Sequence, residues 1–126
     1  MTLEQQVCSL EMAKKLKELG VKQESLFNYY WQDRQFGGKY ILRFSRGSKS
    51  REYISAFTVA ELGDFFDSKL TIYKGHVEWH CRYWWGVEPN PLRFNVTEWH
   101  EAGDKNLANA LAKMLIYLIE NKLIKI

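Results

Sequence analysis

The spacing of apolar residues predicts two long helices, one near each end of the chain. Residues 10–19 repeat apolar side chains every three to four positions, with Ser9 as the expected N-cap. Gly20 fits the left-handed position that ends such a helix. Residues 105–120 show the same period with a wider apolar face, and Asp104 precedes them as the expected cap.

Alternation of apolar and polar residues, strict only in residues 76–85, together with residues that favour strands predicts strands between these helices. The segments expected to be strands are residues 40–45, 52–57, 70–73, 76–85 and 92–99. Residues 46–51 are expected to form a hairpin loop between the first two, and Lys74-Gly75 a tight turn between the next two. Residues 23–31, which are rich in aromatics, are expected to form a helical turn that runs into a strand.

A short helix is expected in the middle of the chain, because Thr58 and Glu61 form a capping box; it should end at about residue 66. Residues 101–104 are expected to end the sheet region. This order of elements predicts an α+β fold, with an antiparallel sheet of about four to five strands packed against N- and C-terminal helices. A chain of 126 residues is expected to be a single domain over 1–126.

Composition places the chain among globular proteins, with 46% hydrophobic and 26% charged residues. Aromatic residues make up 15%, more than a small core buries easily, so some rings should reach the surface and mark contact sites. Cys8 and Cys81 form no CxxC pattern, and no signal peptide or membrane-length apolar run is evident. We therefore expect a soluble protein of the cytoplasm.

Residues 76–85 hold three of the five tryptophans and two of the three histidines. As a strand, this segment has one face suited to the core, made of Val77, Trp79, Cys81, Tyr83 and Trp85. The other face carries His76, Glu78, His80, Arg82 and Trp84. Trp84 beside Arg82 could stack on a planar ring and hold an anion. The alternative is an aromatic covered by a helix or by another subunit.

The expected hairpin loop at 46–51 contains two hydroxyls and three cations, which suits a phosphate group. The alternative is a solvated hairpin tip without a ligand. The net charge is +3, yet residues 1–51 carry ten Lys/Arg against five Asp/Glu, so the positive charge is local. The candidate ligand-binding residues are Trp84, Arg82, His80, Arg46, Lys49, Arg51 and Arg43.

Other chemistries receive less support. His76 and His80 on one strand lie about 13 Å apart, too far to share a metal ion with Glu78, so no metal or cofactor is expected. Cys8, next to a helix start, would be either a reactive thiolate or a small buried apolar group, and the second is favoured. No catalytic motif is evident, so we expect no enzyme. Residues 13–31 resemble a helix-turn-helix but lack a row of basic or amide side chains, which disfavours nucleic-acid binding.

Three stretches resemble a family of small proteins encoded by bacteriophages and prophages. They are CSLEMAKKLKELGVKQESLF at residues 8–27, AFTVAEL at 56–62 and AKMLIYLIENKLI at 112–124, together about a third of the chain. The resemblance implies a phage or prophage origin, work in the host bacterial cytoplasm and an accessory role such as counter-defence. It implies no site residues.

Two functional hypotheses follow. In the first, the protein is a non-catalytic counter-defence factor that sequesters an anionic, nucleotide-like ligand. In the second, it is a protein–protein interaction module that inhibits or clamps a host or phage protein. The apolar face of residues 105–120 and the excess of aromatics also favour a homo-oligomer.

Overall fold

The computed structural model describes residues 2–32, 38–44, 53–66, 70–85 and 99–124. In chain order, the elements are α1 (Leu3–Gln6), α2 (Leu10–Glu18), β1 (Phe27–Gln32), β2 (Lys39–Phe44), β3 (Tyr53–Ser55), α3 (Val59–Gly63), β4 (Leu70–Lys74), β5 (Trp79–Trp84), β6 (Trp99–Asp104) and α4 (Leu107–Glu120). The strands form two antiparallel sheets, ordered β2-β1-β3 and β4-β5-β6. The α+β class is therefore confirmed, whereas the single sheet of four to five strands is wrong.

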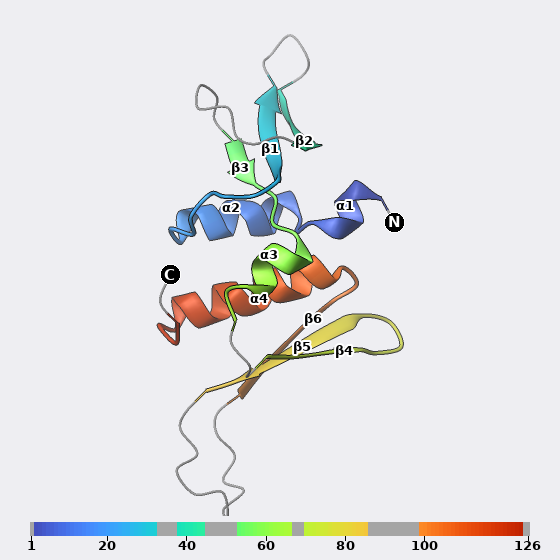
Figure 1. Ribbon diagram of the computed structural model, residues 1–126, viewed down its shortest axis with the longest axis vertical. Coiled ribbons are helices and arrows are strands. Elements are labelled where there is room, and N and C mark those ends of the chain that lie inside the picture. Colours follow the sequence, from blue (N-terminus) through green and yellow to red (C-terminus); the bar gives the residue numbers. More distant parts are fainter. Residues whose placement is uncertain (1, 33–37, 45–52, 67–69, 86–98, 125–126) are drawn as a thin grey trace, which may run out of the picture.

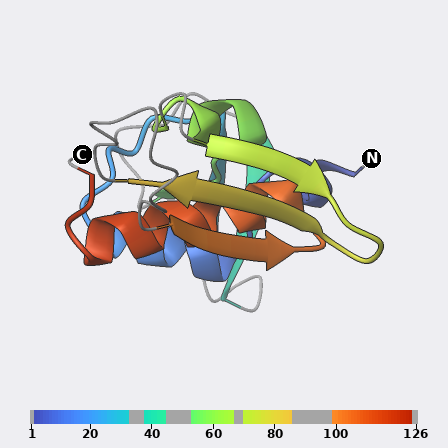
Figure 2. The same cartoon turned by 90° about the horizontal axis from the view of Figure 1, so that it is seen from below.

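The two sheets lie on opposite sides of the helices (Figure 1). Helix α4 crosses one face of β4-β5-β6, as Figure 2 shows from below, and it contacts β5 and β6. Helix α2 lies between α4 and the other sheet, where it contacts β3. The N- and C-terminal helices thus pack on sheets as expected, each on its own sheet. No described helix has both the length and the apolar composition needed to cross a bilayer.

The aromatic segment that begins at Phe27 forms β1, the central strand of the first sheet. Tyr29 lies opposite Leu42 of β2 on one side and opposite Ile54 of β3 on the other. The strand expected at the end of residues 23–31 is therefore confirmed, whereas the helical turn expected before it is wrong, because residues 21–26 are not helical. The direct pairing of β2 with β3 is also wrong. Alternation identifies a strand but not its neighbours, and β1, rich in residues that favour strands, takes the place between the two.

Helix α2 begins and ends as the sequence predicts. The Ser9 side chain accepts a hydrogen bond from the backbone N–H of Met12 at 3.4 Å. Gly20 has a φ of 89°, and the N–H of Val21 donates to the carbonyl of Leu16 at 3.1 Å. This bond is the Schellman ending, so the predicted end of the helix is confirmed.

Helix α3 has the predicted capping box. The hydroxyl of Thr58 accepts from the N–H of Glu61 at 3.2 Å, and the carboxylate of Glu61 accepts from the N–H of Thr58 at 2.9 Å. The helix ends at Gly63, earlier than the predicted residue 66.

Helix α4 is capped by a different residue from the one predicted. The Asn106 side chain accepts from the N–H of Asn109 at 3.3 Å, whereas Asp104 is the last residue of β6 and accepts from the N–H of Asn106 at 2.9 Å. Residues 101–104, expected to end the sheet region, are therefore part of a strand. The strand predicted over 92–99 lies outside the described residues except for Trp99, where β6 begins.

Candidate functional site

The tryptophan-rich segment forms β5, but the strand begins at Trp79 rather than at His76. The N–H of Gly75 donates to the carbonyl of Glu78 at 2.9 Å, which closes the turn between β4 and β5. Val77, predicted to be core, lies in this turn and is 75% exposed. That prediction is wrong because the turn is two residues longer than the two-residue turn assumed from the sequence.

The inner face of β5 packs against α4. Cys81 and Tyr83 are buried, as predicted, and the thiol of Cys81 lies 3.3 Å from the carbonyl oxygen of Ala110 in α4. Trp79 and Trp85, also predicted to be core, are only partly buried. Trp79 is the first residue of β5, and Trp85 follows its last residue, with its ring centroid 6.2 Å from that of Tyr117 in α4.

The opposite face of this sheet, here called the outward sheet face, carries several exposed rings. By register, its positions are Thr71, Tyr73, His80, Arg82, Trp84, Trp99, Glu101 and Gly103. Trp84 and Trp99 lie opposite each other on β5 and β6, and each is 47% exposed. Among these eight positions, Arg82 and Glu101 alone carry a permanent charge near neutral pH. The carboxylate of Glu78, from the turn before β5, also lies over Gly103 on this face. The face is thus aromatic, and the described groups on it include no uncompensated cation.

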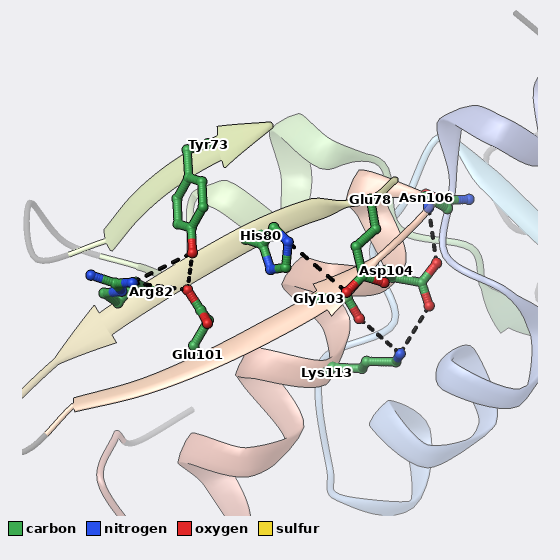
Figure 3. Close-up of polar contacts among 9 residues, drawn as sticks. All are labelled: Tyr73, Glu78, His80, Arg82, Glu101, Gly103, Asp104, Asn106 and Lys113. Atoms are coloured by element: carbon green, nitrogen blue, oxygen red, sulfur yellow. Dashed lines mark hydrogen bonds and ion pairs between the residues drawn. The ribbon is translucent and has the colours of Figure 1, made fainter. Parts of the chain in front are cut away.

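Arg82 and Tyr73 meet at the carboxylate of Glu101 (Figure 3). The guanidinium Nη2 of Arg82 lies 3.1 Å from Oε1 of Glu101, and the Tyr73 hydroxyl donates to the same oxygen. The Tyr73 hydrogen bond and then the Arg82 contacts lower the pKa of Glu101. The guanidinium carbon of Arg82 also lies 4.8 Å from the centroid of the Trp99 ring. The positive charge of Arg82 is therefore compensated within the chain.

His80 is packed into this face rather than presented freely. Its ring stacks on Tyr73, with centroids 5.1 Å apart, and its Nε2 lies 3.9 Å from Oε1 of Glu78 (Figure 3). A Cβ on Gly75 would come within 3.0 Å of the imidazole, and one on Gly103 within 3.1 Å of its Nδ1. That Nδ1 is buried and makes no hydrogen bond within the described part of the chain. The two glycines thus allow the ring to lie flat on the sheet.

The basic candidates do not gather around Arg82. Arg43 is exposed on β2, opposite Asn28, and so belongs to the other sheet. Because the helices separate the two sheets, Arg43 and Arg82 do not share a site (Figure 1). The other predicted basic residues, Arg46, Lys49 and Arg51, lie outside the described residues.

A cavity that sequence reasoning missed lies on the opposite side of the sheet from Arg82. It has a volume of about 740 Å³ and is lined by Gln5, Gln6, Thr58, Val59, Ala60, Trp79, Lys105, Asn106 and Leu107. These residues come from α1, from the first residue of β5, and from the first turns of α3 and α4 together with the residues just before them. No local sequence motif predicts this cavity, because four segments that are distant in the sequence form its wall. Trp79, which lines the cavity, was predicted from the sequence to belong to the core.

The two cysteines and His76 do not add a reactive site in the described part of the chain. Cys8 and Cys81 are buried free thiols, and burial raises the pKa of each from 9.0 to about 12. Cys8 is therefore the small buried apolar group, not a reactive thiolate. His76 precedes β5, so it does not share a strand face with His80. Among the described residues, no three His, Cys, Asp or Glu side chains gather as a metal site.

Comparison with known proteins leaves the family of this chain open. No family model, no curated protein and no solved structure matches it. The resemblance to phage-encoded proteins therefore stays a prediction, and the function has to be argued from the outward sheet face and the cavity.

Proposed function

We propose that the protein is a non-catalytic binding module whose outward sheet face contacts a partner protein. The observation that carries this proposal is the closed ion pair of Arg82 and Glu101 at the centre of exposed aromatic rings. Tyr, Trp and Arg are the residues that most often dominate the binding energy of protein–protein interfaces. Trp84, Trp99 and Tyr73 supply the rings, each more than a third exposed.

The same ion pair favours a protein partner over an anionic, nucleotide-like ligand at this face. An anion would have to displace Glu101 from Arg82, and the described positions of the face hold no second cation. A protein surface instead covers the pair without breaking it and buries the rings around it. The protein-interaction hypothesis is therefore the better supported of the two for this face.

A binding role also agrees with the chemistry of the two cysteines. Both thiols stay protonated near neutral pH because burial raises their pKa, so neither is a nucleophile in the folded protein. The resemblance to phage proteins supplies the setting of the proposal, in which the partner is a host or phage protein in the bacterial cell. Inhibition by clamping that partner is the role that follows.

Capture from bacterial lysate with matched variants tests the proposal. Trp84→Ser removes an exposed ring from the outward sheet face, and Trp31→Ser removes a ring of equal 47% exposure from β1 in the other sheet. We expect the wild type and Trp31→Ser to retain one protein stoichiometrically and Trp84→Ser to lose it. Equal retention by both variants, or no stoichiometric protein with the wild type, would overturn the proposal.

A further inference from the structure

We propose that the cavity between α1, α3, α4 and the start of β5 binds a small ligand composed of a planar aromatic ring and one anionic group. In this site the ring packs against Trp79 and the anion lies at Lys105. The site is independent of the outward sheet face, because Trp79 projects from the opposite side of β5 to Arg82.

The size and lining of the cavity fit a small organic ligand. Its volume of about 740 Å³ lies within the range of about 300–1,000 Å³ that is usual for such sites. Trp79, Val59, Ala60 and Leu107 form its apolar wall. A mostly apolar wall with a few polar groups is the composition that buries a ring and fixes its orientation.

The charged side chains at the wall favour a ligand that carries an anionic group in addition to its aromatic ring. Lys105 is the only charged residue among the nine that line the cavity, and it makes no hydrogen bond or ion pair with the described residues. Lys74 adds a second cation nearby, with its Nζ 5.4 Å from the centroid of the Trp79 ring. Asp104, opposite Trp79 in the sheet, is compensated by Lys113 at 2.9 Å. The local field therefore favours one anionic group.

The polar groups of the wall differ in how free they are to bind. Asn106 is fully used, since its side-chain amide donates to the carbonyls of Glu4 and Val7 and its oxygen caps α4. These bonds fix α1 to the start of α4 and so preform one wall of the cavity. The side-chain oxygen of Gln5 accepts from the N–H of Thr2 at 2.9 Å, which leaves only its amide N–H donors for a ligand, whereas the exposed amide of Gln6 can contact polar edges of a ligand with both its oxygen and its nitrogen.

Two fluorescent probes of nearly the same shape test the proposal. Anilinonaphthalene sulfonate has aromatic rings and one anion, and phenylnaphthylamine has similar rings without the anion. We expect saturable binding of both to the native protein, at one site per chain. Lys105→Gln should weaken binding of the sulfonate about fivefold, the gain expected of one partly exposed ion pair, and leave the neutral probe unchanged.

Control variants locate the site. Lys39→Gln removes an exposed cation from β2 in the other sheet, and Trp84→Ser alters the outward sheet face; neither should change the binding of either probe. Trp79→Leu should weaken both probes, because it removes the ring on which they pack. If Trp79→Leu does not fold, the Lys105→Gln variant still tests the proposal, because Lys105 is exposed and its side chain does not contribute to the core.

Three results would overturn the proposal: unsaturable binding, equal sulfonate affinity in the wild type and Lys105→Gln, or loss of probe binding in Trp84→Ser. The test is separate from that of the partner protein. Lys105→Gln should leave partner capture intact, and Trp84→Ser should abolish capture while leaving the probes bound.

Discussion

Arg82 and Glu101 lie directly opposite each other on β5 and β6, and their side chains pair at 3.1 Å in the middle of the outward sheet face. The Tyr73 hydroxyl from β4 joins the same carboxylate, so all three strands contribute to one polar cluster. Cross-strand pairs of this kind stabilise the register of a sheet. The pair also leaves the described part of the face with exposed aromatic rings and no uncompensated cation.

The titration of Glu101 tests this cluster. We expect its pKa to lie below 4.5, because the Tyr73 hydrogen bond and the Arg82 charge both favour the carboxylate. The ionised carboxylate of Glu101 therefore contributes to the stability of the fold above pH 4.5, and this contribution is lost as the pH falls through the lowered pKa. Carboxyl NMR should show the midpoint rising in Tyr73→Phe and in Arg82→Gln. A wild-type midpoint at or above 4.5 would contradict the geometry.

Asn106 should be among the polar residues that matter most for stability, because it caps α4 and holds two carbonyls of the N-terminal segment. Asn106→Ala should lower the free energy of unfolding by about 2 kcal/mol in urea titrations. Asn106→Ser keeps a capping oxygen but loses the two amide donations, so its loss should be about 1 kcal/mol. Asn121→Ala, at the exposed end of α4, is the control, with an expected change within about 0.5 kcal/mol. Equal effects at 106 and 121 would be evidence against this role.

Two glycines should respond oppositely to alanine. Gly20 has a φ of 89°, which a side chain disfavours, so Gly20→Ala should destabilise the protein by about 1 kcal/mol. Gly63 ends α3, and a Cβ there meets nothing within 4 Å. Gly63→Ala should therefore be neutral or stabilising by up to about 1 kcal/mol. Thermal denaturation of both variants checks the pair, and a stabilised Gly20→Ala would refute the assigned helix end.

Alkaline pH should weaken the fold through its buried acidic protons. Burial raises the pKa of Cys8 and Cys81 from 9.0 to about 12, while the unfolded thiols keep the lower value. The two thiols therefore do not lower the free energy of unfolding below pH 9.0. Between pH 9.0 and about pH 12 the free energy of unfolding falls, because the unfolded chain releases the thiol protons while the folded chain retains them. Urea titrations across this range should show a shallower decline for Cys8→Ala combined with Cys81→Ala. An identical decline would contradict the burial of these thiols.

Local signals in the sequence predicted local structure well. The Ser9 cap, the Gly20 ending and the Thr58–Glu61 capping box are all present, because each depends on residues within a few positions. The two faces of β5 at Cys81 and Arg82 were also predicted, since alternation alone determines them.

The arrangement of the strands could not be read in the same way. Nothing local in residues 40–57 shows that β1 would separate β2 from β3, because pairing is settled by packing between distant segments. The partner of Arg82 could not be predicted for the same reason, because Glu101 lies 19 residues away in a segment that was expected to end the sheet region. Arg82, which was proposed from the sequence as a site for an anionic ligand, is therefore paired with Glu101 in the folded protein.

The most direct test of the proposed function is the affinity of the captured partner protein for the matched tryptophan variants, measured by calorimetry with purified components. Trp84 and Trp31 are equally exposed but lie in different sheets. We predict that Trp84→Ser loses about 2 kcal/mol of binding free energy, about thirtyfold in Kd, whereas Trp31→Ser binds like the wild type. Equal affinity of the two variants, or a loss confined to Trp31→Ser, would contradict the assignment of the outward sheet face as the contact surface.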